Sequence, residues 1–93
     1  MKEKAQKLIE KYEELESELG NPDVLADQAR YNKIHKQYKG IEKAVQKAKE
    51  YLQLVNDLAE YKEALGDPDP EMVAMAKSEI SEIEKKLPGV TDE

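Results

Sequence analysis

Hydrophobic residues recur along this chain at alternating spacings of three and four, which is typical of helices that pack along one apolar stripe. The first stripe is short and ends immediately before a glycine. Its members are Ala5, Leu8, Tyr12, Leu15 and Leu19. No window alternates apolar and polar residues in the manner of a β-strand. The pattern predicts a first helix over residues 2–19, closed by Gly20 in a left-handed backbone conformation.

A second stripe begins at Tyr31 and continues at the same spacing along most of the following segment. Asp27 precedes it in a position suited to an N-cap, and the helical pattern persists as far as Leu65. The sequence therefore predicts one long central helix over residues 27–65. Gly40 lies inside this helix, where glycine is less favourable than alanine by about 1 kcal/mol, and we expect a bend there.

The later half of the central helix carries another stripe on almost the opposite side, at about 100° per residue. Its members are Tyr51, Leu54, Leu58, Tyr61 and Leu65. A third helix is predicted over residues 70–87, because Asp69 suits an N-cap, Pro70 suits the first helical position, and Pro88 with Gly89 favours a stop. Its stripe consists of Val73, Ala76, Ile80, Ile83 and Leu87.

The stripes of the two outer helices match the two halves of the central helix in length, and the connections between them are short. Short connections make consecutive helices antiparallel neighbours. We therefore predict an all-α, three-helix antiparallel and coiled-coil-like bundle, in which a shorter helix folds back on each half of a long central helix. The whole chain, residues 1–93, is expected to be a single helical domain.

The first stripe of the central helix extends beyond the reach of the first helix. Its last positions therefore form a candidate open apolar seam, and such seams on small helical domains bind a partner or a second copy of the chain. The residues of this seam are Ala48, Leu52, Val55 and Ala59.

Composition removes several classes of function. A chain of 93 residues allows one small domain with a thin core, and it leaves no room for a large enclosed active site. It has no cysteine and one histidine, which excludes disulfides, thiolate chemistry and a histidine-rich metal site. The longest apolar run is five residues, Met72–Ala76, far too short to span a membrane, and no secretory signal follows the N-terminal lysines. We expect a cytoplasmic, non-enzymatic protein without cofactor, metal or membrane partner.

The net charge of −6 hides a basic centre, because residues 27–49 contain seven basic and two acidic side chains. Five of the lysines fall within about 120° of arc, opposite the first stripe of the central helix. They are Lys33, Lys36, Lys39, Lys43 and Lys47. Two interpretations are open: contact with RNA phosphates or an acidic protein, or a solvated helix face. The acidic total and the lack of interleaved aromatic residues argue against sequence-specific DNA binding and base stacking.

Three further residue types bear on possible chemistry: histidine, methionine and glutamate. His35 lies at the edge of the apolar stripe, where a surface or boundary position is expected. Met72 and Met75 flank the start of the third helix, where core filling is favoured over a methionine-rich docking groove. The glutamate clusters are expected to be solvated faces that form ion pairs four residues apart.

Three blocks of residues occur in a distinctive order. The first runs from Leu19 to Val24 (LGNPDV), and the second runs from Asp27 to Tyr31 (DQARY). After the long helix comes Asp69 to Met72 (DPEM), which leads into Met75 to Lys77 (MAK). In this order and spacing the blocks resemble the N-terminal helical domain of bacterial class I peptide chain release factors, type one. The resemblance covers nearly the whole chain.

The resemblance implies a role in translation termination. In that family the whole protein reads a stop codon and triggers hydrolysis of peptidyl-tRNA, and the N-terminal helical domain performs neither step. The resemblance further implies that this domain lies toward the stalk of the large ribosomal subunit and touches the methyltransferase that modifies a glutamine of the factor. The Gly-Gly-Gln loop and the Pro-x-Thr tripeptide of the family are absent from these 93 residues, so we expect a fragment of a longer factor.

Periodicity alone leaves an alternative open. A generic dimerising coiled-coil or helical adaptor, unrelated to translation, needs the same apolar spacing. Self-association of the chain through Leu52 and Val55 would favour that alternative.

Overall fold

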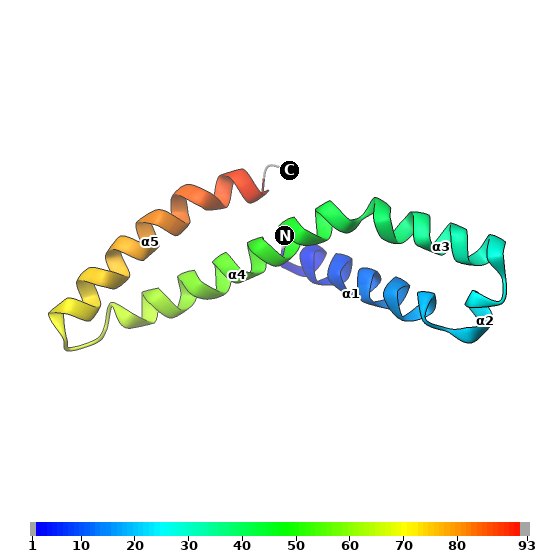
Figure 1. Cartoon of the computed structure of the whole chain (residues 1–93). Helices are drawn as coiled ribbons and strands as arrows, with labels where there is room; N and C mark the ends of the chain where they lie inside the picture. Colours follow the sequence, from blue (N-terminus) through cyan, green and yellow to red (C-terminus); the bar gives the residue numbers. More distant parts are fainter. Residues whose placement is uncertain (1, 92–93) are drawn as a thin grey trace. The chain divides into compact units, whose positions relative to one another are not determined.

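The computed structural model describes the backbone of residues 2–91 and the side chains of residues 2–88. All regular elements in this described part are helices, in the order α1 (Lys2–Leu19), α2 (Pro22–Leu25), α3 (Gln28–Gly40), α4 (Glu42–Ala64) and α5 (Pro70–Thr91) (Figure 1). The predicted all-α class is therefore confirmed. The chain divides into two compact units, Met1–Lys49 and Glu50–Glu93, and each is described by itself.

The turn after α1 differs from the prediction for Gly20. No described residue has a positive φ angle. Instead, the Gly20 N–H donates to the Ser17 carbonyl at 3.1 Å, and the Asn21 N–H donates to the Glu18 carbonyl at 3.0 Å. These three-residue hydrogen bonds tighten the last turn and satisfy the terminal carbonyls, so the chain leaves the helix without a left-handed residue.

Side-chain caps start the next two helices. The Asn21 Oδ1 accepts a hydrogen bond from the Asp23 N–H at 2.9 Å, and Pro22 occupies the first position of α2. The Asp27 Oδ1 accepts from the Arg30 N–H at 3.2 Å, which confirms the predicted N-cap of the helix that follows. Both caps satisfy backbone donors that the helix itself leaves without partners.

The predicted helix over residues 27–65 is interrupted, so it forms two helices, α3 and α4. Ile41 lies between them with φ −104° and ψ 1°, outside helical geometry. Its N–H still donates to the Gln37 carbonyl, at a long 3.3 Å, and its carbonyl accepts from the Val45 N–H at 2.9 Å. Gly40 directly precedes the break, and glycine offers the least resistance to such a departure. The bend expected at Gly40 therefore takes the form of a local break.

The first unit has a core to which three helices contribute. Leu15 of α1, Val24 of α2 and Ile34 of α3 form a buried cluster. Partly buried apolar side chains pack around it: Leu19, Tyr31, Tyr38 and Ile41. The short α2 contacts both α1 and α3 and covers the end of their apolar stripes. Val24 is completely buried as a result.

The second unit is a helical hairpin made of the later part of α4 and of α5, which returns alongside it (Figure 1). Ala76 and Ile83 are its buried side chains among the described residues. In the connection, the Asp67 Oδ1 accepts from the Asp69 N–H at 2.8 Å. The Asp69 Oδ1 accepts from the Glu71 N–H at 2.9 Å, which confirms the predicted cap of α5.

The end of α5 lies beyond the predicted stop. The helix extends to Thr91 with Pro88 inside it. Proline has no N–H to donate to the preceding turn and its ring crowds the carbonyl four residues earlier. The helical backbone nevertheless continues for three residues beyond Pro88. Among the described residues, no helix is both long enough and apolar enough to span a bilayer.

Candidate functional site

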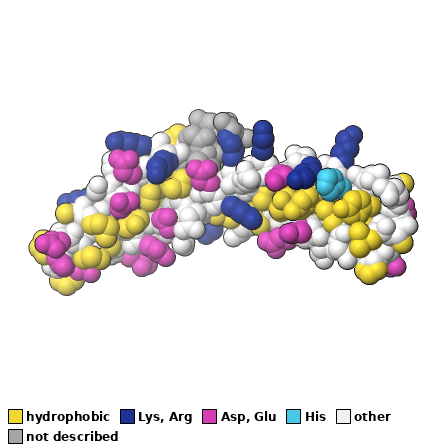
Figure 2. All heavy atoms as spheres, in the orientation of Figure 1, with side chains coloured by type: hydrophobic (Ala, Val, Ile, Leu, Met, Phe, Trp, Pro, Cys, Tyr) yellow, Lys and Arg dark blue, Asp and Glu magenta, His cyan; other side chains and the backbone are white. Residues whose placement is uncertain are grey.

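The five predicted lysines are divided between two helices of the first unit. Lys33, Lys36 and Lys39 lie on α3, and Lys43 and Lys47 lie on α4. The first four in sequence are exposed and Lys47 is half-buried. Figure 2 shows dark blue lysine and arginine side chains standing out from the upper edge of the part that contains α3. We call these five lysines the basic face.

The break at Ile41 does not turn the basic face toward the core. Ile34 on one side of the break and Val45 on the other are both buried. At about 100° per residue, four of the lysines lie about half a helical turn away from these two residues, and Lys33 lies about a quarter turn from Ile34. All of the five lysines except Lys47 are exposed. The predicted separation of the lysines from the apolar stripe therefore persists through the break.

An ion pair between Lys39 and Glu42 reduces the charge of this surface. The Lys39 Nζ lies 3.4 Å from the Glu42 Oε2, and the two residues stand on either side of the break. Glu42 is the only acidic residue between positions 28 and 49. More than half of the Lys39 side chain is exposed, so the pair is well solvated and contributes little to stability. The basic face therefore keeps a net positive charge.

An aromatic pair joins α1 to α3 in the same unit. The rings of Tyr12 and Tyr38 are stacked, with their centroids 4.3 Å apart and their planes 14° from parallel. The Lys49 Nζ lies 6.0 Å from the centroid of the Tyr12 ring, at the outer limit of a cation–π contact. Tyr12 thus packs against α3, and Lys49 of α4 reaches its ring only at the distance limit of a cation–π contact.

The environment of Tyr12 changes its acidity. A side-chain hydrogen bond with Tyr38 is the largest cause that raises the pKa of the Tyr12 phenol from 10.0 to about 12. Desolvation and the carboxylates of Glu42 and Glu16 act in the same direction. The phenol is therefore neutral at physiological pH and offers no ionised nucleophile.

Sequence reasoning placed the tyrosines on the apolar stripes but missed this stack. Tyr12 and Tyr38 occupy stripe positions in consecutive antiparallel helices, and that signal was available. The sequence spacing does not give the register between the two helices, because that register depends on the path of α2. His35 is half-buried and its ring lies 6.0 Å from that of Tyr31, which confirms the predicted boundary position.

The four residues of the candidate apolar seam do not share one environment. Ala48 belongs to the first unit and is buried there. The other three belong to the second unit, where Leu52 and Val55 are half-buried and Ala59 is exposed. An open seam therefore remains a prediction only for the last three. Among the described residues, no group of three histidine, cysteine or carboxylate side chains is placed to hold a metal ion.

Comparison with known proteins places the chain in a family. The PCRF domain matches residues 8–93. The chain is 42% identical over 90 residues to peptide chain release factor 1 of Oleidesulfovibrio alaskensis, covering 97% of this chain and 25% of that protein. It is 36% identical over 92 residues to peptide chain release factor 1 of Bacteroides thetaiotaomicron, covering 98% of this chain and 25% of that protein. No solved structure matches.

The chain spans about a quarter of the length of these relatives. The match to the family covers both the basic face and the hairpin of the second unit, so neither unit lies outside it. The resemblance drawn from the LGNPDV, DQARY and DPEM blocks is therefore confirmed. The chain belongs to the PCRF domain family.

Proposed function

We propose that this chain is the non-catalytic helical domain of a bacterial peptide chain release factor and that it acts in translation termination in the cytoplasm. One observation carries the proposal. The chain is 42% identical to a protein named peptide chain release factor 1, and the aligned residues cover 97% of this chain. Because the chain spans about a quarter of such proteins, we assign stop-codon reading and peptidyl-tRNA hydrolysis to the remaining three quarters.

The side-chain environment supports a non-catalytic role. Among the described residues, every buried side chain is apolar, and no polar or charged side chain is buried. General acid–base catalysis depends on a carboxylate, lysine or histidine whose surroundings tune its pKa, which normally requires burial or a strong charged partner. The described helices leave most of their carboxylates and lysines exposed, and Glu42, Asp57 and Glu79 are half-buried.

We further propose that the domain works as a docking arm and that the basic face is its contact with the ribosome. Four of the five lysines are exposed, so a partner reaches them without unfolding the domain. Ribosomal RNA offers a dense array of phosphates, which lysines bind as point charges. The stalk side of the large subunit is the proposed location, and the methyltransferase that modifies the factor is a proposed second partner.

A chimeric factor tests the role in termination. Residues 1–93 would replace the matching quarter of peptide chain release factor 1 of Oleidesulfovibrio alaskensis, and peptide release from ribosomes stalled at stop codons would be measured. We expect release by the chimera and none by the isolated chain. A folded, ribosome-bound chimera without release activity would contradict the proposal.

Charge reversal tests the basic face in the same chimera. The variant K33E/K36E/K43E leaves the Lys39–Glu42 pair intact. The matched control K4E/K7E/K11E reverses three exposed lysines on α1 and changes the net charge equally. We expect the first variant to bind ribosomes more weakly and to lower the slope of log affinity against log salt by about 0.7–0.9 for each lost phosphate contact.

The control is expected to retain the slope of the parent chimera. Equal weakening by both variants would show an effect of total charge rather than of this face. An unchanged slope in the first variant would show that the basic face is a solvated surface.

A further inference from the structure

Exposed apolar side chains gather at the end of the hairpin in the second unit. Met72 and Met75 are 39% and 41% exposed, and Leu65 is 39% exposed. The two methionines are three residues apart on α5 and are therefore neighbours on its surface. The core filling predicted for them is wrong, because α5 buries Ala76 and Ile83 instead.

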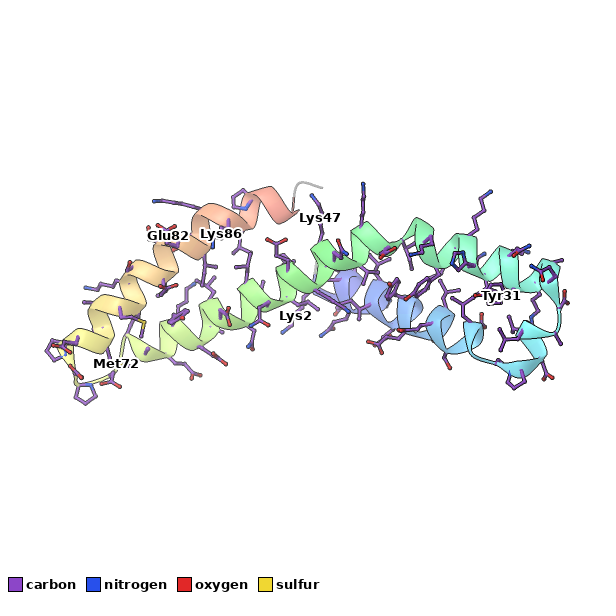
Figure 3. The ribbon with its side chains drawn as sticks, in the orientation of Figure 1. Lys2, Tyr31, Lys47, Met72, Glu82 and Lys86 are labelled. Carbon is purple, nitrogen blue, oxygen red and sulfur yellow. The ribbon has the colours of Figure 1, made fainter. Side chains whose placement is uncertain are left out.

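Carboxylates neighbour the two methionines along the chain, whereas Leu65 lines a surface hollow together with Lys77 and Lys85. Residues 63–75 contain four carboxylates and no lysine or arginine. The Asp67 carboxylate accepts a hydrogen bond from the Asp69 N–H, and the Asp69 carboxylate accepts one from the Glu71 N–H. These bonds to neutral backbone groups leave the negative charge of the segment in place. Figure 3 labels Met72 where α5 begins, and Figure 2 shows hydrophobic and acidic side chains intermingled at that end. We call this surface the acidic tip, and its residues are Leu65, Asp67, Asp69, Glu71, Met72 and Met75.

We propose that the acidic tip is a docking surface for a basic amphipathic helix of a partner protein. Flexible methionine side chains adapt to the apolar face of such a helix, and carboxylates around them attract lysines and arginines at the edge of that face. An RNA or an anionic membrane would meet like charge here. The same end of a second copy would bring its own carboxylates against these. The inference does not depend on the proposed role in termination.

The test uses the full chain labelled with ¹³C at its methionine methyl groups. The probe is a short synthetic helix of leucine and lysine with its leucines along one face. Two control peptides share its length: one replaces lysine by glutamate, and the other replaces leucine by serine. We expect the leucine–lysine peptide to shift the Met72 and Met75 signals in a saturable manner and to leave Met1 unchanged. The two control peptides should produce little shift.

Substitutions show which side chains of the acidic tip contribute to peptide affinity. The double variant M72Q/M75Q removes the exposed apolar surface of α5 and is expected to weaken binding of the leucine–lysine peptide at least about tenfold, which corresponds to about 1.4 kcal/mol. The matched control L25Q removes a 57% exposed leucine from α2 in the first unit and should bind as the parent does. E71Q removes one charge that caps nothing in the described structure and should weaken binding less, with a loss that disappears at high salt.

Several results would overturn the proposal. They are equal shifts with the leucine–glutamate peptide, equal loss of affinity in L25Q and M72Q/M75Q, or shifts that avoid both methionines. Methyl shifts that grow with protein concentration in the absence of peptide would assign the surface to a second copy of the chain. If circular dichroism shows that M72Q/M75Q has lost helix, the affinity of this variant is not used. The methionine methyl shifts of the parent chain with the three peptides then decide whether the acidic tip binds the leucine–lysine peptide.

Discussion

The two units of this chain use the same apolar spacing and reach different results. The first unit places a third element, α2, across the end of the α1 and α3 stripes, so Leu15, Val24 and Ile34 are buried from several sides. The second unit is a two-helix hairpin, in which each helix can cover only one side of the other. Its buried set among the described residues is Ala76 and Ile83, and larger apolar side chains remain exposed at its end.

Charge separates the units as clearly as packing does. Residues 1–49 contain eleven basic and nine acidic side chains, whereas residues 50–93 contain four basic and twelve acidic side chains. The net charge of the whole chain therefore describes neither unit. Because the basic face lies in the first unit and the acidic tip lies in the second, one small chain carries two surfaces of opposite charge.

The comparison teaches that a regular apolar stripe predicts helices without predicting how well they are covered. Coverage depends on a third element, and in the first unit that element is four residues long. A partner protein can provide the same coverage from outside. The exposed apolar residues of the second unit are where such coverage is lacking.

The largest effect is expected on the free energy of unfolding, when the same substitution, isoleucine to alanine, is made once in each unit. Ile34→Ala removes a buried side chain from the three-element core of the first unit and should lower the free energy of unfolding by about 2–5 kcal/mol. Ile80→Ala makes the same change at a half-buried position of the hairpin and should lower it by about 1–2 kcal/mol, since less surface leaves water there on folding.

Urea unfolding followed by circular dichroism measures both losses. Amide hydrogen exchange assigns each loss to α1 and α3 or to α5. Equal losses at the two isoleucines would contradict the difference in packing between the units.

Sequence reasoning worked best where structure depends on neighbours along the chain. The spacing predicted a first helix over residues 2–19, and α1 occupies Lys2–Leu19. Asp27 and Asp69 act as the caps that their positions indicated. Four of the five lysines of the basic face are exposed, as expected for side chains opposite an apolar stripe, whereas Lys47 is half-buried.

The features that the sequence did not predict depend on packing between helices and on the local backbone conformation. Gly20 was expected to be left-handed, but tighter hydrogen bonds close α1 without that conformation. The Tyr12–Tyr38 stack depends on the register between two helices, which sequence spacing leaves undetermined. The exposure of Met72 was missed because the spacing does not show how wide a stripe one neighbouring helix can cover.

A smaller effect is expected at the break between α3 and α4. A Cβ atom added at Gly40 would meet no other atom within 4 Å, and the backbone there has no positive φ. Gly40→Ala should therefore raise the free energy of unfolding of the first unit by about 1 kcal/mol, because alanine favours helix more than glycine does. Thermal unfolding measures the gain, and backbone chemical shifts at Ile41 report whether the break persists.

The control for this prediction is Gly20→Ala. A Cβ atom at Gly20 would lie 3.6 Å from the Ser17 carbonyl oxygen, an ordinary contact, but Gly20 lies in a turn outside the helices. Helix propensity acts weakly at that position, so the gain should be smaller. A loss of stability in Gly40→Ala would show that the break relieves strain that a straight helix would introduce.

The smallest effect is confined to alkaline pH and concerns the aromatic pair of the first unit. The pKa of Tyr12 is raised to about 12 in the folded chain, mainly by its hydrogen bond with Tyr38, against 10.0 for an unperturbed phenol. Between these two values the folded state holds a proton that the unfolded state has lost, so stability falls as the pH rises through this window. Tyr12→Phe removes that contribution and should flatten the decline measured by urea unfolding. Tyr38→Phe removes the largest cause of the raised pKa, so the absorbance of the Tyr12 tyrosinate should develop at lower pH. If the stability of the parent and of Tyr12→Phe declined in parallel with pH, the stack would hold no such proton.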